Sequence, residues 1–183
     1  LAIVFGYACH PTTLSFNKLS GDYPGFAQIE LEELYPGVTA MFFQGGGADQ
    51  NPIPRRTVGL AKQYGKELAA SVERVLSEDM ERQESVLVTG YAEIDLPFEE
   101  SLPATELEKI AQGTDYQAKW AEGMLHDMQS GNPVITSYPF PVGFWRMGKQ
   151  AMFILGGELL ISYTISLKEI FGENIFVMGY AND

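Results

Sequence analysis

Short apolar runs that are rich in β-forming residues alternate with segments of helical periodicity along the chain, and this alternation limits the folds open to it. Residues 1–8 and 38–43 have the composition of buried strands. Between them, residues 24–37 carry apolar side chains at helical spacing and close on a Pro-Gly pair that ends the helix. This pattern predicts an α/β layered domain with a mixed β-sheet and flanking helices.

The alternation continues to the end of the chain. Residues 57–76 give the clearest helical pattern, because apolar residues such as Leu68, Val72 and Val75 recur every three or four positions. The remaining expectations are strands at residues 84–96, 150–155 and 174–180, helices at residues 105–128 and 158–171, and an extended segment at residues 134–147.

The composition narrows the class of protein. The chain has 183 residues, of which 45% are hydrophobic, and a formal net charge of -12. We therefore expect residues 1–183 to form a single folded domain rather than a disordered chain. No apolar run approaches the roughly 20 residues of a membrane span, and the lack of a basic cluster argues against nucleic-acid binding. Residues 78–122 hold 12 acidic and 3 basic side chains, which we interpret as a solvated surface.

Polar residues that could take part in catalysis or metal binding follow the ends of the predicted strands, where open α/β folds build their sites. His10 closes the first strand, and Asp49 and Asn51 lie in the glycine-rich loop after the second. Glu158 follows a Gly-Gly pair after a later strand and is expected to begin a helix. A histidine and a carboxylate delivered from strand ends are typical zinc ligands.

Each of these residues also has a structural interpretation. A histidine beside a proline is more often a structural residue than a ligand, and a glutamate in a first helical turn is expected from the helix dipole. The glycine-rich loop lacks the Lys-Ser/Thr ending of a phosphate-binding loop, so it is either a tight link or a site wall. Cys9 is interpreted as a small buried residue, because neighbours on a strand point to opposite faces and His10 is poorly placed to activate its thiol. Arg55 and Arg56 either hold an anionic group or lie on the surface.

An ordered set of motifs is more specific than any one of these residues. In chain order they are ACHPTTL (residues 8–14), NKLSGDYPGFA (17–27), FFQGGGADQNP (42–52), Gly157-Glu158 and GYAND (179–183). This set resembles the neutral/alkaline non-lysosomal ceramidase family over most of the chain, and the resemblance is weakest at about residues 78–140. It implies that residues 1–183 are part of a larger ceramidase-like catalytic domain.

The resemblance implies a zinc-dependent hydrolase that cleaves the N-acyl amide bond of ceramide or a related lipid amide, with a role in sphingolipid metabolism and a secreted or periplasmic location. His10 and Glu158 fall on two of the family's zinc ligands, with Gly156 where the family has proline. Two further ligands are implied outside the chain, a histidine upstream of Leu1 and a tyrosine shortly beyond Asp183. We therefore expect residues 1–183 alone to bind zinc weakly or not at all.

One departure from the family concerns the catalytic chemistry. Asn51 occupies the position of the family's catalytic serine, and an amide cannot act as a nucleophile, although it can donate a hydrogen bond to a developing oxyanion. Direct attack by water activated on zinc is the remaining route, with Asp49 or Asp22 as the candidate general base. The expected contacts to substrate come from Gly46, Gly47 and Arg55.

Two other functions fit the same residues. The first is a non-catalytic descendant that binds a lipid or a glycan, and this alternative is suggested by Asn51 in place of serine. The second is a hydrolase of a different ester or amide, because substrate choice depends on pocket walls that a sequence does not display. The oligomeric state is left open by the sequence.

Overall fold

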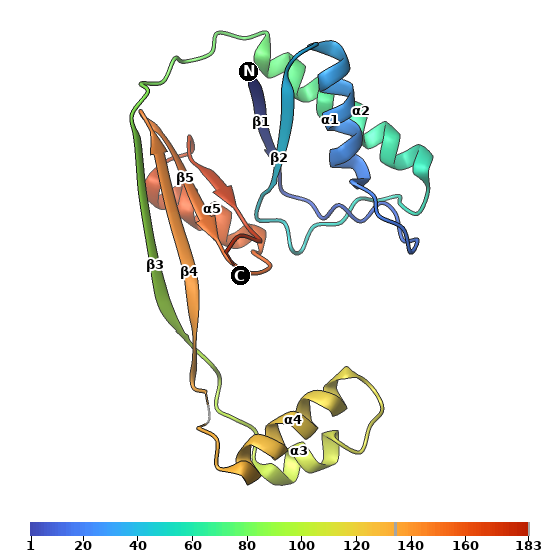
Figure 1. Cartoon of the computed structure of the whole chain (residues 1–183), viewed down its shortest axis with the longest axis vertical. Coiled ribbons are helices and arrows are strands. Elements are labelled where there is room, and N and C mark those ends of the chain that lie inside the picture. The colour runs from blue at the N-terminus through green and yellow to red at the C-terminus, as the bar shows by residue number, and fades with distance from the viewer. Residues whose placement is uncertain (134, 183) are drawn as a thin grey trace. The chain divides into compact units, whose positions relative to one another are not determined.

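The computed structural model describes residues 1–133 and 135–182 (Figure 1). Val134, at the start of the expected extended segment, and Asp183, at the end of the GYAND motif, lie outside the described residues. The strands are β1 (Ala2–Tyr7), β2 (Thr39–Gln44), β3 (Leu87–Pro97), β4 (Ser137–Met147), β5 (Gln150–Leu155) and β6 (Phe176–Met178). The helices are α1 (Asp22–Leu34), α2 (Val58–Leu76), α3 (Ala104–Ile110), α4 (Tyr116–Ser130) and α5 (Ile161–Phe171). This mixed content confirms the predicted α/β class.

The chain folds as two compact units. The first unit combines Leu1–Ala92 with Pro141–Asp183, and the second is Glu93–Phe140. All residues named as site candidates from the sequence belong to the first unit. The long strands β3 and β4 contribute to both.

The first unit begins with a β-α-β element in which β1 and β2 pair in parallel, from Ala2 opposite Thr39 to Tyr7 opposite Gln44. α1 connects the two strands, and α2 lies beside α1 (Figure 1). Both helices pack on one face of the strands, where the buried core contains Phe5, Ala27, Leu31, Ala40 and Ala69. Gly65 lets the helices approach closely, since a Cβ there would lie 2.9 Å from the backbone nitrogen of Ala27.

A second sheet of the same unit has the strand order β3-β4-β5-β6. β4 and β5 are antiparallel, whereas β5 and β6 are parallel. β6 meets the first sheet through a hydrogen bond of 2.9 Å from Gly179 N to Gln44 O and through ring contact between Phe43 and Phe176. The carboxyl ends of β1, β2, β5 and β6 are thereby brought to one side of the unit.

Two helices differ from the sequence-based expectation. Residues 105–128 form α3 and α4 instead of one helix, because the chain turns at Gly113 and the Asp115 side chain caps α4 by accepting from Ala118 N. α5 begins at Ile161 instead of Glu158, because the residue before it, Leu160, is extended. Glu158 therefore lies in the connection between β5 and α5.

The second unit holds the α3–α4 pair, which buries Leu107, Ala118 and Ala121 between the helices. α4 ends at Gly131, whose positive φ of 70° is the usual glycine helix terminus. Among the helices of the described residues, none is long and apolar enough to cross a membrane.

Candidate functional site

The loops that follow β1 and β2 lie side by side. His10 N donates to Gln50 O at 3.0 Å, which joins the histidine motif to the glycine-rich loop. Gly47 packs directly against the first loop, since a Cβ at this position would lie 2.6 Å from Cys9 N and 2.5 Å from Ala8 O. Only glycine fits this contact without moving the backbone, so Gly47 is required for the two loops to approach this closely.

The loops after β5 and β6 join the same cluster. Ala48 N donates to Leu159 O at 3.0 Å, and Tyr180 N donates to Gly157 O at 3.0 Å. The extended Leu159 segment pairs with the glycine-rich loop, which explains why α5 starts later than its sequence predicts. We call residues 8–14, 45–56, 156–160 and 179–182 the strand-end loops.

His10 has a defined orientation within the strand-end loops. Its Nε2 lies 2.8 Å from Ala48 O, and because a carbonyl oxygen only accepts, Nε2 carries the hydrogen. In the neutral ring Nδ1 is then the acceptor, and the Tyr180 hydroxyl donates to it at 3.3 Å. A metal-bound histidine is commonly oriented by such a bond from its other ring nitrogen.

Tyr180 is a site residue that the sequence reasoning did not single out. Its ring contacts His10 edge to face, with centroids 6.1 Å apart. Desolvation raises the pKa of its hydroxyl, and the negative charge of Glu158 raises it further. The signal available in the sequence was the GYAND motif, and the structure adds a φ of 58°, which is uncommon for a residue other than glycine.

Asn51 is held by two donors. Its Oδ1 accepts from Thr12 Oγ1 at 2.9 Å and from an Arg55 guanidinium nitrogen at 3.0 Å. Arg55 thus contacts the side chain at the expected serine position. Because the oxygen is occupied, the amide nitrogen of Asn51 is the group left to donate to another molecule.

Asp49 is exposed, and its side chain lies beside the first residue of α5. Its Oδ1 accepts from Ile161 N at 3.1 Å. This backbone hydrogen bond lowers the pKa of the Asp49 carboxyl below its ordinary value. The carboxylate is therefore ionised at neutral pH and caps the helix that follows Glu158.

Asp22 occupies a different environment, because its side chain is enclosed and only 5% exposed. Oδ1 accepts from Thr13 N at 3.2 Å and Tyr23 N at 2.7 Å, and Oδ2 accepts from Leu14 N at 2.8 Å. The residue also has a positive φ of 48°, which aspartate tolerates better than most residues. This geometry ties the loop after His10 to the start of α1.

Tyr23 and Cys9 complete the support behind His10. The Tyr23 hydroxyl donates to Cys9 O at 2.5 Å. Burial raises the pKa of both side chains, and the nearby Asp22 charge acts in the same direction on each. Cys9 is therefore a protonated thiol at neutral pH, in agreement with its interpretation as a small buried residue.

The metal-binding capacity of these residues is limited. The described part of the chain contains no group of three or more His, Cys, Asp and Glu side chains placed to hold a metal ion. His10 and Glu158 are two residues of the types that bind zinc, whereas a structural zinc site has four ligands. A complete zinc site would need ligands from outside the described residues.

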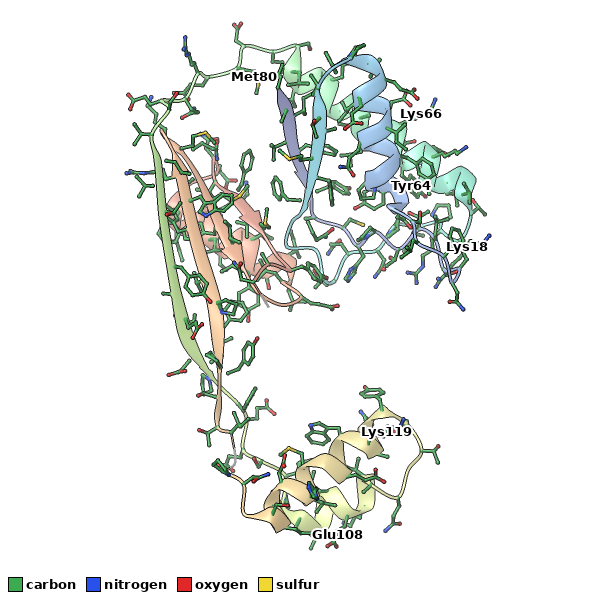
Figure 2. All side chains as sticks on the ribbon, viewed as in Figure 1. Lys18, Tyr64, Lys66, Met80, Glu108 and Lys119 are labelled. Carbon is green, nitrogen blue, oxygen red and sulfur yellow. The ribbon has the colours of Figure 1, made fainter. Side chains whose placement is uncertain are left out.

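A cavity of about 470 Å³ opens beside Asn51. It extends from the strand-end loops to α2, and its wall includes Tyr7, Tyr64 and Glu67. Tyr64, labelled in Figure 2, is fixed by a bond of 2.6 Å from its hydroxyl to Pro54 O. The volume lies in the usual range of small-molecule sites.

The chain matches no protein-family profile and no curated protein sequence. It is similar in structure to a ceramidase in complex with C2, with a TM-score of 0.62 and 14% identity over 98% of this chain and 38% of that chain. It is also similar to neutral ceramidase from Pseudomonas aeruginosa, with a TM-score of 0.61 and 15% identity over 98% of this chain and 37% of that chain. The chain thus spans less than two fifths of either structure. At this level of identity the likeness establishes the fold: residues 1–183 have the fold of one part of a neutral ceramidase.

Proposed function

We propose that the chain forms part of a zinc-dependent amidohydrolase that cleaves the N-acyl amide of ceramide or a related lipid amide outside the cytoplasm. The single observation that carries this proposal is the convergence of the strand-end loops, which groups His10, Tyr180 and Glu158. The ordered motifs and the ceramidase-like fold support the same reaction class.

His10 and Glu158 are the proposed zinc ligands of this chain. The bond from His10 Nε2 to Ala48 O leaves Nδ1 as the ligating atom. The Tyr180 hydroxyl now donates to Nδ1, so a metal held by this atom would take the place of that bond. When bound, zinc supplies Lewis acidity toward the substrate carbonyl.

Asn51 is the proposed donor to the carbonyl oxygen. Thr12 and Arg55 fix its amide oxygen, so the amide nitrogen keeps one orientation and needs no reorganisation when charge develops. Gly46 and Gly47 belong to the same loop and are buried, because a Cβ at Gly46 would meet the Thr164 side chain and a Cβ at Gly47 would meet the Ala8 backbone. Their proposed contacts to substrate are therefore made by backbone groups alone.

Asp49 and Asp22 are the two candidate general bases. The environment favours Asp49, because its carboxylate is exposed to water and ionised at neutral pH. Asp22 accepts three backbone N–H bonds, which supports a positioning role for the loop that carries His10.

The test uses the full-length encoded protein, purified and analysed for metal and for hydrolysis of short-chain ceramides and simple N-acyl amides. We expect about one zinc per chain, and we expect His10→Ala and Glu158→Gln to lose both zinc and turnover. His126→Ala, which changes the chain's second histidine on α4, and Glu33→Gln on α1 are the matched controls. A wild-type protein without zinc, or zinc retained at equal affinity in His10→Ala, would contradict the proposal.

A non-catalytic lipid- or glycan-binding protein is the second candidate, and Asn51 at the expected serine position favours it. This candidate predicts that the full-length protein binds its ligand without turnover and that Glu158→Gln binds equally well. Turnover that Glu158→Gln abolishes would eliminate it. A third possibility is hydrolysis of a different ester or amide. It is distinguished by comparing the turnover of such esters and amides with that of ceramides at equal concentration.

A further inference from the structure

β1 has a neighbouring strand on one side only, because the two-stranded sheet has the order β1-β2. Gly45 N donates to Tyr7 O, so Tyr7 and the other odd-numbered residues of β1 direct their backbone groups toward β2. The N–H and C=O groups of Ala2, Val4 and Gly6 point to the opposite edge. Within residues 1–133 and 135–182, these groups have no hydrogen-bond partner.

The outer edge of β2 is different, because three of its backbone groups have hydrogen-bond partners. Gln28 donates to Ala40 O at 2.8 Å, and Ala40 N donates to Glu32 at 3.0 Å. Gly179 N donates to Gln44 O further along the same edge. The sheet is therefore partly covered beyond β2 and open beyond β1.

A groove of about 500 Å³ follows the open edge of β1. Val72, Val75 and Met80 line it on the side of α2, and Phe43 and Phe176 line it on the other side. Met80, labelled in Figure 2 beyond the end of α2, is 63% exposed. The groove thus has apolar walls and a floor of unpaired backbone groups.

This combination selects the chemistry of the occupant. An acyl chain would cover the apolar walls but would leave six backbone donors and acceptors unpaired, which is costly once water is excluded. A β-strand would pair with these groups and would place alternate side chains on the two walls. An apolar edge strand left open is also prone to aggregation, so a folded protein is expected to cover it.

We infer that the free edge of β1 is covered by a β-strand of the same catalytic fold that comes from outside residues 1–183. The matched ceramidase structures support this source, because 62% of one and 63% of the other lie outside the part that this chain matches. The inference concerns the fold and does not depend on the proposed amidase chemistry.

The occupant is identified by photo-crosslinking in the full-length encoded protein. A photoreactive phenylalanine analogue replaces Val4, which is 55% exposed, and in a control protein it replaces Ile29 of α1, which is 54% exposed. We expect the probe at Val4, and not the probe at Ile29, to form a high-yield intramolecular link to one apolar segment outside residues 1–183. Links only within residues 1–183, links to a second copy, or no links would overturn the inference.

Hydrogen exchange provides a readout without substitution. An open edge gives an alternating pattern, in which the amides of Phe5 and Tyr7 exchange slowly and those of Val4 and Gly6 exchange about 100-fold faster or more. We expect the full-length protein to lack this alternation, with all four amides within about 10-fold of one another at every protein concentration. An alternating pattern, or protection of Val4 and Gly6 that disappears on dilution, would refute an intramolecular strand.

Discussion

Replacement of Gly47 by alanine tests the contact on which the strand-end loops depend. The added Cβ would lie 2.6 Å from Cys9 N and 2.5 Å from Ala8 O, and both atoms belong to the backbone. A Cβ needs about 3.4 Å from such atoms. Its shortest contact is with Ala8 C, so the two loops must separate by roughly 1 Å. Forcing extra volume into a packed site of this kind costs about 1–3 kcal/mol of folding free energy.

The separation has a second effect on the histidine loop. The bonds from His10 N to Gln50 O and from His10 Nε2 to Ala48 O measure 3.0 and 2.8 Å. An added separation of roughly 1 Å would take both beyond hydrogen-bonding distance. We therefore expect Gly47→Ala to lower the stability of the protein, and also to lower the zinc affinity proposed for the site of His10.

The matched control is Gly25→Ala. Gly25 lies within α1, and a Cβ there would have no atom within 4 Å. Alanine in a helix is favoured over glycine by about 0.5–1 kcal/mol, so this variant should be slightly more stable than wild type. Urea titrations followed by circular dichroism at 222 nm compare the three proteins. The reasoning is refuted if Gly47→Ala unfolds at the same urea concentration as wild type, or at a higher one.

Three further predictions follow from capping and buried hydrogen bonds. Asp22→Asn turns one acceptor into a donor that faces a backbone N–H, so the free energy of unfolding measured in urea should fall by about 1–3 kcal/mol. The control Glu33→Gln, on the exposed side of α1, should cause no measurable loss. Thr57→Ala removes the side chain that accepts at the start of α2, and the same measurement should show a loss of about 1 kcal/mol; Thr57→Ser should keep most of it. The lowered pKa of Asp49 means that its stabilising bond to Ile161 is fully present above its ordinary pKa of 3.8 and is lost as pH falls through the lowered value. The difference in urea midpoint between wild type and Asp49→Asn should therefore shrink between about pH 5 and about pH 3, and a constant difference would contradict this assignment.

The parts of the fold that depend on local pattern could be predicted from the sequence. β1, β2 and α2 follow from apolar periodicity, and the strand-end positions of His10 and Asn51 follow from the polar residues after each strand. These features are local, so a single sequence carries them. The split between α3 and α4 also had a local signal in Gly113 and Asp115, which the longer helical pattern concealed.

The remaining features depend on contacts between distant segments. The partnership of Tyr180 with His10 joins residues 170 positions apart, and no local pattern encodes it. The late start of α5 likewise depends on the pairing of Leu159 with Ala48 across the cluster. The enclosure of Asp22 depends on the return of the chain from residues 13 and 14, so sequence alone could not separate a positioning carboxylate from a candidate base.

The two bonds from α1 to Ala40 determine where that helix sits. Gln28 and Glu32 are one helical turn apart and bond the carbonyl and the amide of a single residue. A slide of α1 by one residue would move it about 1.5 Å along its axis and rotate its side chains by about 100°, which would break both bonds together. The two bonds in the middle of α1 therefore fix its position along its axis and its rotation. Asp22, the first residue of α1, in turn fixes the position of the loop that carries His10.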